Sequence, residues 1–246
     1  MKPLLEIRNL TKFYSKNDKL PAVCDISLVI NKNSSLALIG ESGCGKTTLA
    51  KIIMGLEKPT KGEVVFNGSN IAKMKESQLR PLRRDVQMIF QYSKSVFNPS
   101  YTVGDSIREV LLAHEKLSHE ECQRRLDEIF EVVKLPNSFQ KKYVSQLSGG
   151  QCQRANIARS LILKPKLLIC DEPVASLDYA IRHRVLELLQ EIRQTTDVTY
   201  LLITHDLSNV KDLCQNVAIM YKGNIVELAK VETDLDRVVK HPYSID

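Results

Sequence analysis

The feature that most constrains the fold is the glycine-rich stretch GESGCGKTTLA, which runs from Gly40 to Ala50. It follows the apolar run SLALI and precedes KIIMGL, so we predict that a strand leads into it and a helix leads out of it. Its spacing is G-x-x-x-x-G-K-T, in which bare backbone N–H groups and the start of a helix surround an anion. We therefore predict a phosphate loop made of Gly40, Glu41, Ser42, Gly43, Cys44, Gly45, Lys46, Thr47 and Thr48.

Two side chains at the end of this loop have specific chemistry. Lys46 would place a positive charge on the β- and γ-phosphates of a nucleoside triphosphate, and the Thr47 hydroxyl would bind the accompanying Mg²⁺. A flexible turn without a ligand does not explain why a lysine and a hydroxyl fall at the start of the helix. Cys44 has two interpretations: a thiol activated by the helix dipole and Lys46, or a small residue accommodated in the loop.

Composition sets wider limits. The chain has 246 residues, of which 43% are hydrophobic, enough to bury a core as one domain or two closely joined lobes. No run approaches the roughly 18 apolar residues of a membrane span, so we expect a soluble, unexported protein. The six cysteines form no C-x-x-C pair, which indicates reduced thiols and predicts no structural metal. The net charge of +6 is spread along the chain, as on an ordinary solvated surface.

Segments of different periodicity follow one another along the chain. Short β-type segments occupy residues 4–70, with one helix after the phosphate loop, and strand signals mostly lapse over residues 73–158. Strand and helix patterns alternate again after residue 158, which predicts an α/β core with parallel strands. The predicted strands are LLEIRNL, VCDISLVI, SSLALIG, GEVVFNG, KLLIC, VTYLLIT and NVAIMYKGNIVEL.

Two helices are predicted from apolar residues at helical spacing. One is LSHEECQRRLDEIFEVVKL, with an apolar face of Cys122, Leu126, Ile129, Val132 and Val133. The other is AIRHRVLELLQEIRQT, with an apolar face of Ile181, Val185, Leu188, Leu189 and Ile192.

An acidic pair follows the apolar run KLLIC. Asp171 at the end of this strand would hold the hydration shell of Mg²⁺, and Glu172 would orient and deprotonate an attacking water. Ligands gather at the carboxyl ends of strands in open α/β sheets. Without the phosphate loop, a simple turn would be the preferred interpretation of this pair.

A third motif, LSGGQ, lies just before a predicted helix that leads to the acidic strand. It resembles the signature of the ATP-binding cassette (ABC) ATPases, and further motifs follow the order of that family over nearly the whole chain. These are Tyr14, Gln91, the SLD motif at residues 176–178, and His205 within ITHD.

The resemblance implies a role for each of these residues. Tyr14 stacks on adenine, Gln91 belongs to the Q-loop and reaches the metal and the reacting phosphate, and His205 contacts the γ-phosphate as a neutral imidazole. The signature and D-loop residues bind ATP held by a second cassette, so that two cassettes bury two ATP molecules. They are Ser148, Gly149, Gly150, Gln151 and Asp178.

The resemblance also implies the fold. Residues 1–246 would form a single ABC nucleotide-binding domain of the α/β class, with a P-loop (RecA-like) core. The catalytic lobe would span approximately residues 1–90 and 159–246 and would include an N-terminal antiparallel β subdomain. An inserted α-helical subdomain, the signature lobe, would span approximately residues 91–158.

The expected activity is hydrolysis of MgATP coupled to transport, at the cytoplasmic face of a membrane. The expected partners are a second ATPase subunit, with a heterodimer favoured over a homodimer, a separate membrane permease, and an extracytoplasmic binding protein. Exposed Tyr92, Phe97 and Tyr101 would form the permease-docking groove, although packing within the lobe explains each of them equally well. The segments FNPSYTVGDSI and HPYSID resemble those of oligopeptide, dipeptide and nickel importers, and leave the cargo open between peptides and a nickel-like metal. We predict no iron–sulfur cluster, because the cysteine-containing extension of many relatives is missing after HPYSID.

Other classes fit less well. ABC ATPases that act on nucleic acid carry long insertions between the phosphate loop and the signature, and no sustained heptads occur between Lys46 and Ser148. We therefore predict no nucleic-acid partner. A translation-associated member would be expected to hold two cassettes, and a non-hydrolysing regulator would not keep Lys46, Asp171, Glu172 and His205. An exporter ATPase remains the alternative to an importer.

Overall fold

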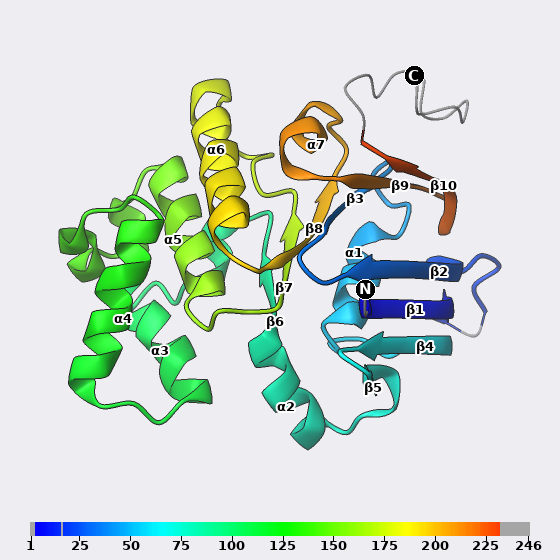
Figure 1. The fold of residues 1–246 in the computed structure, drawn as a ribbon, viewed down its shortest axis with the longest axis horizontal. Helices are drawn as coiled ribbons and strands as arrows, with labels where there is room; N and C mark the ends of the chain where they lie inside the picture. Colours follow the sequence, from blue (N-terminus) through cyan, green and yellow to red (C-terminus); the bar gives the residue numbers. More distant parts are fainter. Residues whose placement is uncertain (1–2, 16, 232–246) are drawn as a thin grey trace. The chain divides into compact units, whose positions relative to one another are not determined.

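The computed structural model describes residues 3–15 and 17–231 (Figure 1). The chain divides into two compact units, one from Met1–Arg83 with Asp197–Asp246 and the other from Arg84–Thr196. The two units are defined by which residues pack together, whereas the predicted catalytic and signature lobes are defined by their expected roles. The predicted lobe boundaries near residues 90 and 159 therefore stay a prediction. The HPYSID segment used for the subfamily prediction lies outside the described residues.

An antiparallel sheet forms the N-terminal part of the first unit, as predicted. Its strand order is β2-β1-β4-β5, and each neighbouring pair is antiparallel. From Ile26 onward, β2 alternates buried and exposed residues, the pattern of a sheet with one face in the core. The strands are β1 (Pro3–Lys12), β2 (Val23–Asn31), β4 (Lys61–Phe66) and β5 (Ser69–Asn70).

Four further strands of the first unit support the phosphate loop. Strand β3 (Ser35–Ile39) pairs in parallel with β8 (Thr199–Thr204) on one side and β9 (Asn216–Tyr221) on the other, and β10 (Asn224–Lys230) runs antiparallel to β9. Every residue of β3 and β8 is buried, as in parallel strands covered on both faces. The glycine-rich stretch leaves the carboxyl end of β3 and enters α1 (Lys46–Ile53), which confirms the predicted order of strand, loop and helix.

The second unit combines two parallel strands with four helices. Strand β6 (Val86–Ile89) pairs with β7 (Leu167–Asp171). At each helix start, the side chain of the preceding residue accepts a backbone hydrogen bond from the first turn, which caps the helix. The helices are α3 (Val103–His114), α4 (His119–Val132), α5 (Gly149–Leu161) and α6 (Tyr179–Thr195), capped by Thr102, Ser118, Ser148 and Asp178.

Short elements complete the two units. They are the 3-10 helices η1 (Ile71–Lys73), η2 (Ser93–Val96), η3 (Asn137–Lys141) and η4 (Val144–Gln146), and the α-helices α2 (Glu76–Asp85) and α7 (Ser208–Leu213).

The structure corrects one residue of the predicted face of α4. Cys122, Leu126, Ile129 and Val133 are buried, but Val132 is 45% exposed. At 3.6 residues per turn, Val133 returns to the direction of Cys122 after about three turns, whereas the residue before it points about 100° away. The inclusion of Val132 in the apolar face was therefore wrong.

Candidate functional site

The phosphate loop is closely packed at both ends. Gly45, just before α1, has φ +110°, and a Cβ there would lie 2.1 Å from the carbonyl oxygen of Ala22. A Cβ on Gly40 would lie 2.2 Å from the carbonyl oxygen of Met220. Neither position accepts a side chain without movement of the backbone, so the two glycines are required by packing as well as by the phosphate-loop pattern.

A turn from the far end of the chain supports this loop. The turn between β9 and β10 contains Gly223, whose N–H donates to the carbonyl oxygen of Cys44 at 3.0 Å. The carbonyl oxygen of Gly223 accepts from the N–H of Cys24, at the start of β2, at 2.8 Å. The turn therefore joins the phosphate loop to the antiparallel sheet.

Lys46 lies inside the loop. Its side chain is buried, and Nζ donates hydrogen bonds to the carbonyl oxygens of Gly40 at 2.6 Å and Glu41 at 2.7 Å. The Sγ of Cys44, also buried, lies 3.7 Å from Nζ. The loop thus contains a fixed cation, while the next residue, Thr47, is exposed at the start of α1. The burial of Cys44 agrees with its interpretation as a small residue accommodated in the loop.

His205 shares the sheet edge from which the phosphate loop begins. Strand β8 is in register with β3 so that Thr204 lies opposite Ile39. Gly40 and His205 are the next residues of the two strands, and both follow the carboxyl ends. His205 is exposed, and the backbone beyond it is turned by a hydrogen bond from the N–H of Asp206 to Thr204 Oγ1 at 3.1 Å. The structure therefore brings His205 and the phosphate loop to one edge, as ligand sites in such sheets require.

Tyr14 also approaches the phosphate loop. It follows β1 and is 59% exposed, and its hydroxyl lies 3.0 Å from Oγ1 of Thr48, the last residue assigned to the loop. Its hydroxyl also reaches Glu57, which the sequence analysis did not predict to be part of the site. The one local signal for Glu57 is Gly55, whose positive φ of 65° marks a turn at the end of α1.

The acidic pair and Gln91 lie at one edge of the second unit. Asp171 is the last residue of β7 and is buried, and Glu172 follows it with φ +48°. Seven other non-glycine residues among the described ones also have a positive φ, so this conformation does not by itself mark Glu172. Strand β6 pairs in parallel with β7 and places Ile89 opposite Cys170, so Gln91 leaves β6 at the same edge as Asp171.

The signature residues form the start of α5. Ser148 Oγ accepts from the N–H of Gln151 at 3.4 Å, and the Oε1 of Gln151 accepts from the N–H of Ser148 at 3.0 Å. This reciprocal capping box leaves Ser148 and Gly149 exposed at the positive end of the helix. Asp178 caps α6 by accepting from the N–H of Ile181 at 3.1 Å.

The next glycine of the signature connects these two helices. A Cβ on Gly150 would lie 2.4 Å from Cγ2 of Ile181, whereas a Cβ on Gly149 would make an ordinary contact with Leu177 at 3.4 Å. We expect Gly150→Ala to lower the free energy of unfolding by about 1–3 kcal/mol because α5 and α6 must separate. Gly149→Ala is the matched control and should not lower it, since alanine favours a helix. Urea unfolding measures both variants, and equal stability of the two would contradict this packing argument.

Comparison with known proteins identifies the group to which these motifs belong. Residues 23–175, which include the phosphate loop, the signature and the acidic pair, match the family described as ABC transporter. The chain belongs to the ABC transporter family. It is an ABC ATPase, and we refer to it below as the cassette.

Relatives of the cassette are similar over almost all of its length. It is 39% identical to the oligopeptide transport ATP-binding protein OppF of Escherichia coli, over 99% of this chain and 76% of that protein. It is 39% identical to the nickel import ATP-binding protein NikE of Shigella boydii, over 93% of this chain and 87% of that protein. Both are ATP-binding proteins by name.

Solved structures of other cassettes have the same fold. One is a dimer of the ATP-binding cassette MJ0796 in a post-hydrolysis state with ADP and Pi, with a TM-score of 0.83, 27% identity, and coverage of 93% of this chain and 99% of that one. The other is cbiO1 from Clostridium perfringens, part of the complex cbiONQ, with a TM-score of 0.86, 27% identity, and coverage of 96% and 92%. These similarities confirm the predicted P-loop ATPase fold class.

The aromatic residues predicted to form a docking groove differ in exposure. Tyr92 is 66% and Tyr101 is 41% exposed, but Phe97 is only 5% exposed. Phe97 follows η2, which packs against α5, and its N–H closes the turn on the carbonyl oxygen of Lys94. The prediction that Phe97 is exposed was therefore wrong, and only the two tyrosines belong to the surface.

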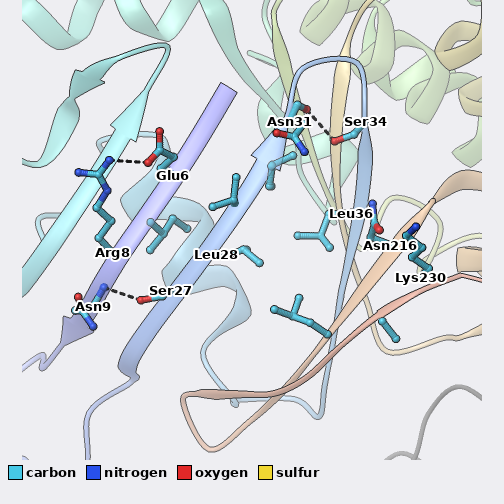
Figure 2. A pocket seen from close by; sticks show the side chains of 15 residues that line it. Glu6, Arg8, Asn9, Ser27, Leu28, Asn31, Ser34, Leu36, Asn216 and Lys230 are labelled. Atoms are coloured by element: carbon cyan, nitrogen blue, oxygen red, sulfur yellow. Dashed lines mark hydrogen bonds and ion pairs between the residues drawn. The ribbon is translucent and has the colours of Figure 1, made fainter. Parts of the chain in front are cut away.

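Two further features concern the described residues as a whole. Among residues 3–15 and 17–231, none of the helices has both the length and the apolar content needed to cross a bilayer. A pocket of about 740 Å³ lies in the first unit, lined by residues of β1, β2 and β10 with Ser34, Leu36 and Asn216 (Figure 2). None of the predicted site residues lines it, so this pocket is separate from the phosphate loop.

The thiol nearest the signature is not activated. Cys152 lies on α5 directly after Gln151. Burial raises the pKa of the Cys152 thiol, and the opposing effects of a hydrogen bond with Ser93 and of the charge on Lys94 are smaller. Since its ordinary pKa is already above neutrality, this thiol stays protonated at neutral pH and is not a nucleophile.

Proposed function

We propose that the cassette is the ATP-hydrolysing motor of a membrane importer that takes up peptides or a nickel-like metal, free or chelated. The observation that carries this proposal is the arrangement of a phosphate loop and a histidine at one strand edge, in a chain that also has the signature and an acidic strand end. The name of NikE supports an importer, and the names of OppF and NikE together support the two cargo classes.

In this proposal the first unit holds most of the nucleotide. The phosphate loop surrounds the phosphates through its N–H groups, Lys46 provides a positive charge, and Tyr14 stacks on the adenine. Thr47, Gln91 and Asp171 would hold Mg²⁺, since a hydroxyl, an amide and a carboxylate all offer the oxygen ligands that this ion prefers. When bound, Mg²⁺ offsets the charge of the phosphates.

Hydrolysis is assigned to Glu172 and His205. The carboxylate of Glu172 accepts a proton from the attacking water and orients it in line with the bond that breaks. His205, as a neutral imidazole, donates a hydrogen bond to the γ-phosphate. The position of Glu172, directly after the buried Asp171 at the carboxyl end of β7, supports an assigned role for this residue, because ligands gather at that edge of parallel sheets.

The exposed start of α5 is assigned to a second cassette. Ser148, Gly149, Gly150 and Gln151 would bind the phosphates of an ATP molecule held by that partner, with Asp178 beside them. The exposed helix N-terminus supports this role, because it offers N–H groups to an anion. The solved dimer of MJ0796 supports pairing of cassettes, and we propose that this cassette pairs with an unlike one.

The remaining partners follow from the importer assignment. We propose a separate membrane permease, which contacts a surface that includes Tyr92 and Tyr101, and an extracytoplasmic binding protein that delivers cargo. The cassette would then lie at the cytoplasmic face of the membrane as a peripheral subunit. Closure of the cassette pair on ATP would move the permease, because ATP binds the closed pair more tightly than the open one.

Cargo is tested in cells that carry either the natural chain or Lys46→Ala. In metal-limited growth, we expect Lys46→Ala to lower the cellular content of one metal selectively if the cargo is nickel-like, as measured by elemental analysis of nickel, cobalt and zinc. If the metals are unchanged, uptake of labelled peptides is expected to fall instead. A strain in which neither metal content nor peptide uptake changes would contradict the importer assignment.

A further inference from the structure

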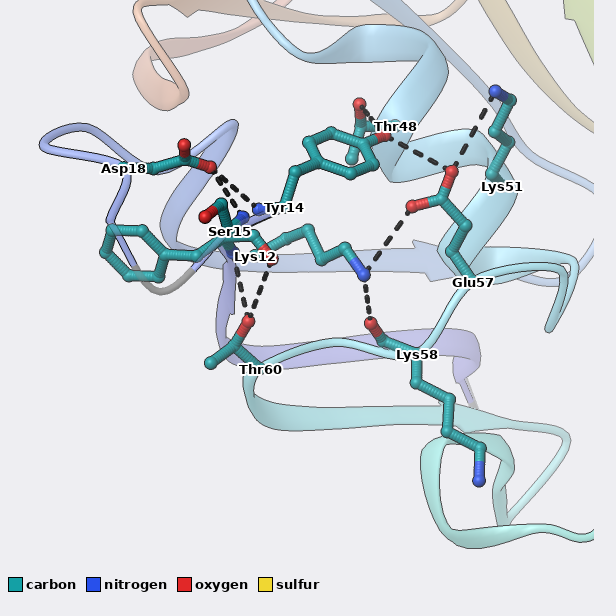
Figure 3. Close-up of polar contacts among 10 residues, drawn as sticks. Lys12, Tyr14, Ser15, Asp18, Thr48, Lys51, Glu57, Lys58 and Thr60 are labelled. Atoms are coloured by element: carbon teal, nitrogen blue, oxygen red, sulfur yellow. Dashed lines mark hydrogen bonds and ion pairs between the residues drawn. The ribbon is translucent and has the colours of Figure 1, made fainter.

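Hydrogen bonds from side chains hold the main chain around Tyr14 in place (Figure 3). The N–H groups of Tyr14 and Ser15 both donate to Oδ2 of Asp18, at 3.1 and 2.7 Å. On the other side, the N–H of Phe13 donates to Oγ1 of Thr60 at 2.9 Å. The position from which the tyrosine side chain leaves the backbone is therefore set by two side chains.

The phenol of Tyr14 is held in a directed chain of hydrogen bonds. Its hydroxyl lies 3.2 Å from Glu57 Oε1 and 3.0 Å from Thr48 Oγ1. Because a carboxylate only accepts, the single hydrogen of the phenol goes to Glu57, and the phenol oxygen accepts from the Thr48 hydroxyl. The order of donation is Thr48 to Tyr14 to Glu57, which ties the ring to a residue of the phosphate loop.

Glu57 is itself fixed in place. The chain turns after α1 so that the N–H groups of Leu56 and Glu57 both donate to the carbonyl oxygen of Lys51, at 2.9 and 3.3 Å. The Glu57 carboxylate lies 3.6 Å from Lys12 Nζ and 3.8 Å from Lys51 Nζ, and its side chain is mostly buried. Two cations and a helical turn thus hold the group that accepts from the phenol.

Lys12 distinguishes the two faces of the tyrosine ring. Its Nζ donates to the carbonyl oxygen of Lys58 at 2.8 Å and lies 5.3 Å from the centroid of the Tyr14 ring. A cation over a ring face is attracted to the ring, and its side chain occupies the space in which another ring would stack on that face. A nucleobase would therefore stack on the opposite face.

We propose that Glu57 is a positioning residue, which orients Tyr14 as the platform for the nucleobase, and that Lys12 determines which ring face is offered. This inference rests on the proposed nucleotide function of the cassette. Glu57 does not touch the nucleotide in this proposal; it acts through the phenol. Its effect should therefore appear with ligands that contain a base and should be absent with ligands that contain only phosphates.

The experiment compares the affinity of the purified full chain for MgATP and for magnesium tripolyphosphate, by calorimetry. Glu57→Ala is expected to weaken MgATP binding about three- to tenfold, the effect of losing a hydrogen bond to a partly exposed charged group, and to leave tripolyphosphate binding unchanged. Glu57→Gln keeps an accepting oxygen and should restore most of the ATP affinity. Tyr14→Phe should weaken MgATP binding at least as much as Glu57→Ala, because it also removes the bond from the Thr48 hydroxyl. The double variant should lose nothing beyond Tyr14→Phe, because the bond between the phenol and Glu57 is already absent there.

The control is Glu63→Ala, which removes a carboxylate of the same unit that is paired with Lys73 at 2.7 Å. It should change neither affinity. The positioning role would be overturned if Glu57→Ala weakened the binding of both ligands equally, or if it did not weaken MgATP binding. The proposed nucleotide binding would stand in either case. A natural chain that binds neither ligand would overturn the proposed nucleotide function together with this inference.

Discussion

Glu172→Gln is expected to bind MgATP with nearly unchanged affinity and to lose ATP hydrolysis by about two to four orders of magnitude, the usual contribution of a general base. The amide has the shape of the carboxylate but does not take a proton from water. The backbone at residue 172 should keep its left-handed conformation, with φ +48°, because glutamate and glutamine begin with the same Cβ. Binding without hydrolysis should also accumulate the ATP-bound cassette pair.

Release of inorganic phosphate at saturating MgATP measures the first effect, and size-exclusion chromatography with ATP measures the second. Glu191→Gln is a matched control, since Glu191 is an exposed carboxylate of the second unit paired with Lys134 at 2.6 Å. The control should hydrolyse ATP at the natural rate. Unchanged turnover in Glu172→Gln would remove Glu172 from its assigned role.

Lys46→Ala is expected to lower the affinity for MgATP about ten- to hundredfold, the effect of losing hydrogen bonds from a charged group. The loss should exceed that for an exposed lysine because this ammonium is buried within the loop, where water screens its charge less. The carbonyl oxygens of Gly40 and Glu41 would also lose their common donor, which loosens the loop.

Titration with a fluorescent ATP analogue at fixed Mg²⁺ measures this affinity. Lys73→Ala is the control, because Lys73 is an exposed lysine of the same unit whose ammonium pairs with Glu63. Affinity of Lys46→Ala within twofold of the control would show that the loop binds phosphate without its lysine, and the assigned role would be wrong.

The strands and helices that the sequence predicted are those with a clear local period. Strands β1 to β4, β7 and β8 and helices α4 and α6 follow from apolar patterns. The prediction of NVAIMYKGNIVEL as one strand was wrong, because the turn at Lys222 and Gly223 divides it into the antiparallel strands β9 and β10. Strand β6 does not follow from an apolar pattern, because its four residues are too few to show a period and its burial depends on pairing with β7. The same limit explains Phe97, whose exposure depends on the packing of η2 against α5.

Some residues of the candidate site could be predicted from the sequence, and others could not. Lys46, Thr47, Ser148 and Asp171 could be predicted because each belongs to a short motif whose spacing sets its geometry. Glu57 could not be predicted, because its contact with Tyr14 joins residues 43 positions apart in the chain. The partners of the Lys46 ammonium are backbone carbonyls, which carry no sequence signal at all.

The turn at Gly223 has a consequence for the time at which the phosphate loop is completed during protein synthesis. The loop leaves the ribosome before β9 and β10 do, but the carbonyl that faces Gly40 belongs to Met220, and the N–H that binds Cys44 belongs to Gly223. A nascent chain therefore carries the whole motif long before it carries the support for it. The loop gains this support only after β9 and the turn at Gly223 have been made, so a chain that is cut short before β9 has the motif without its support.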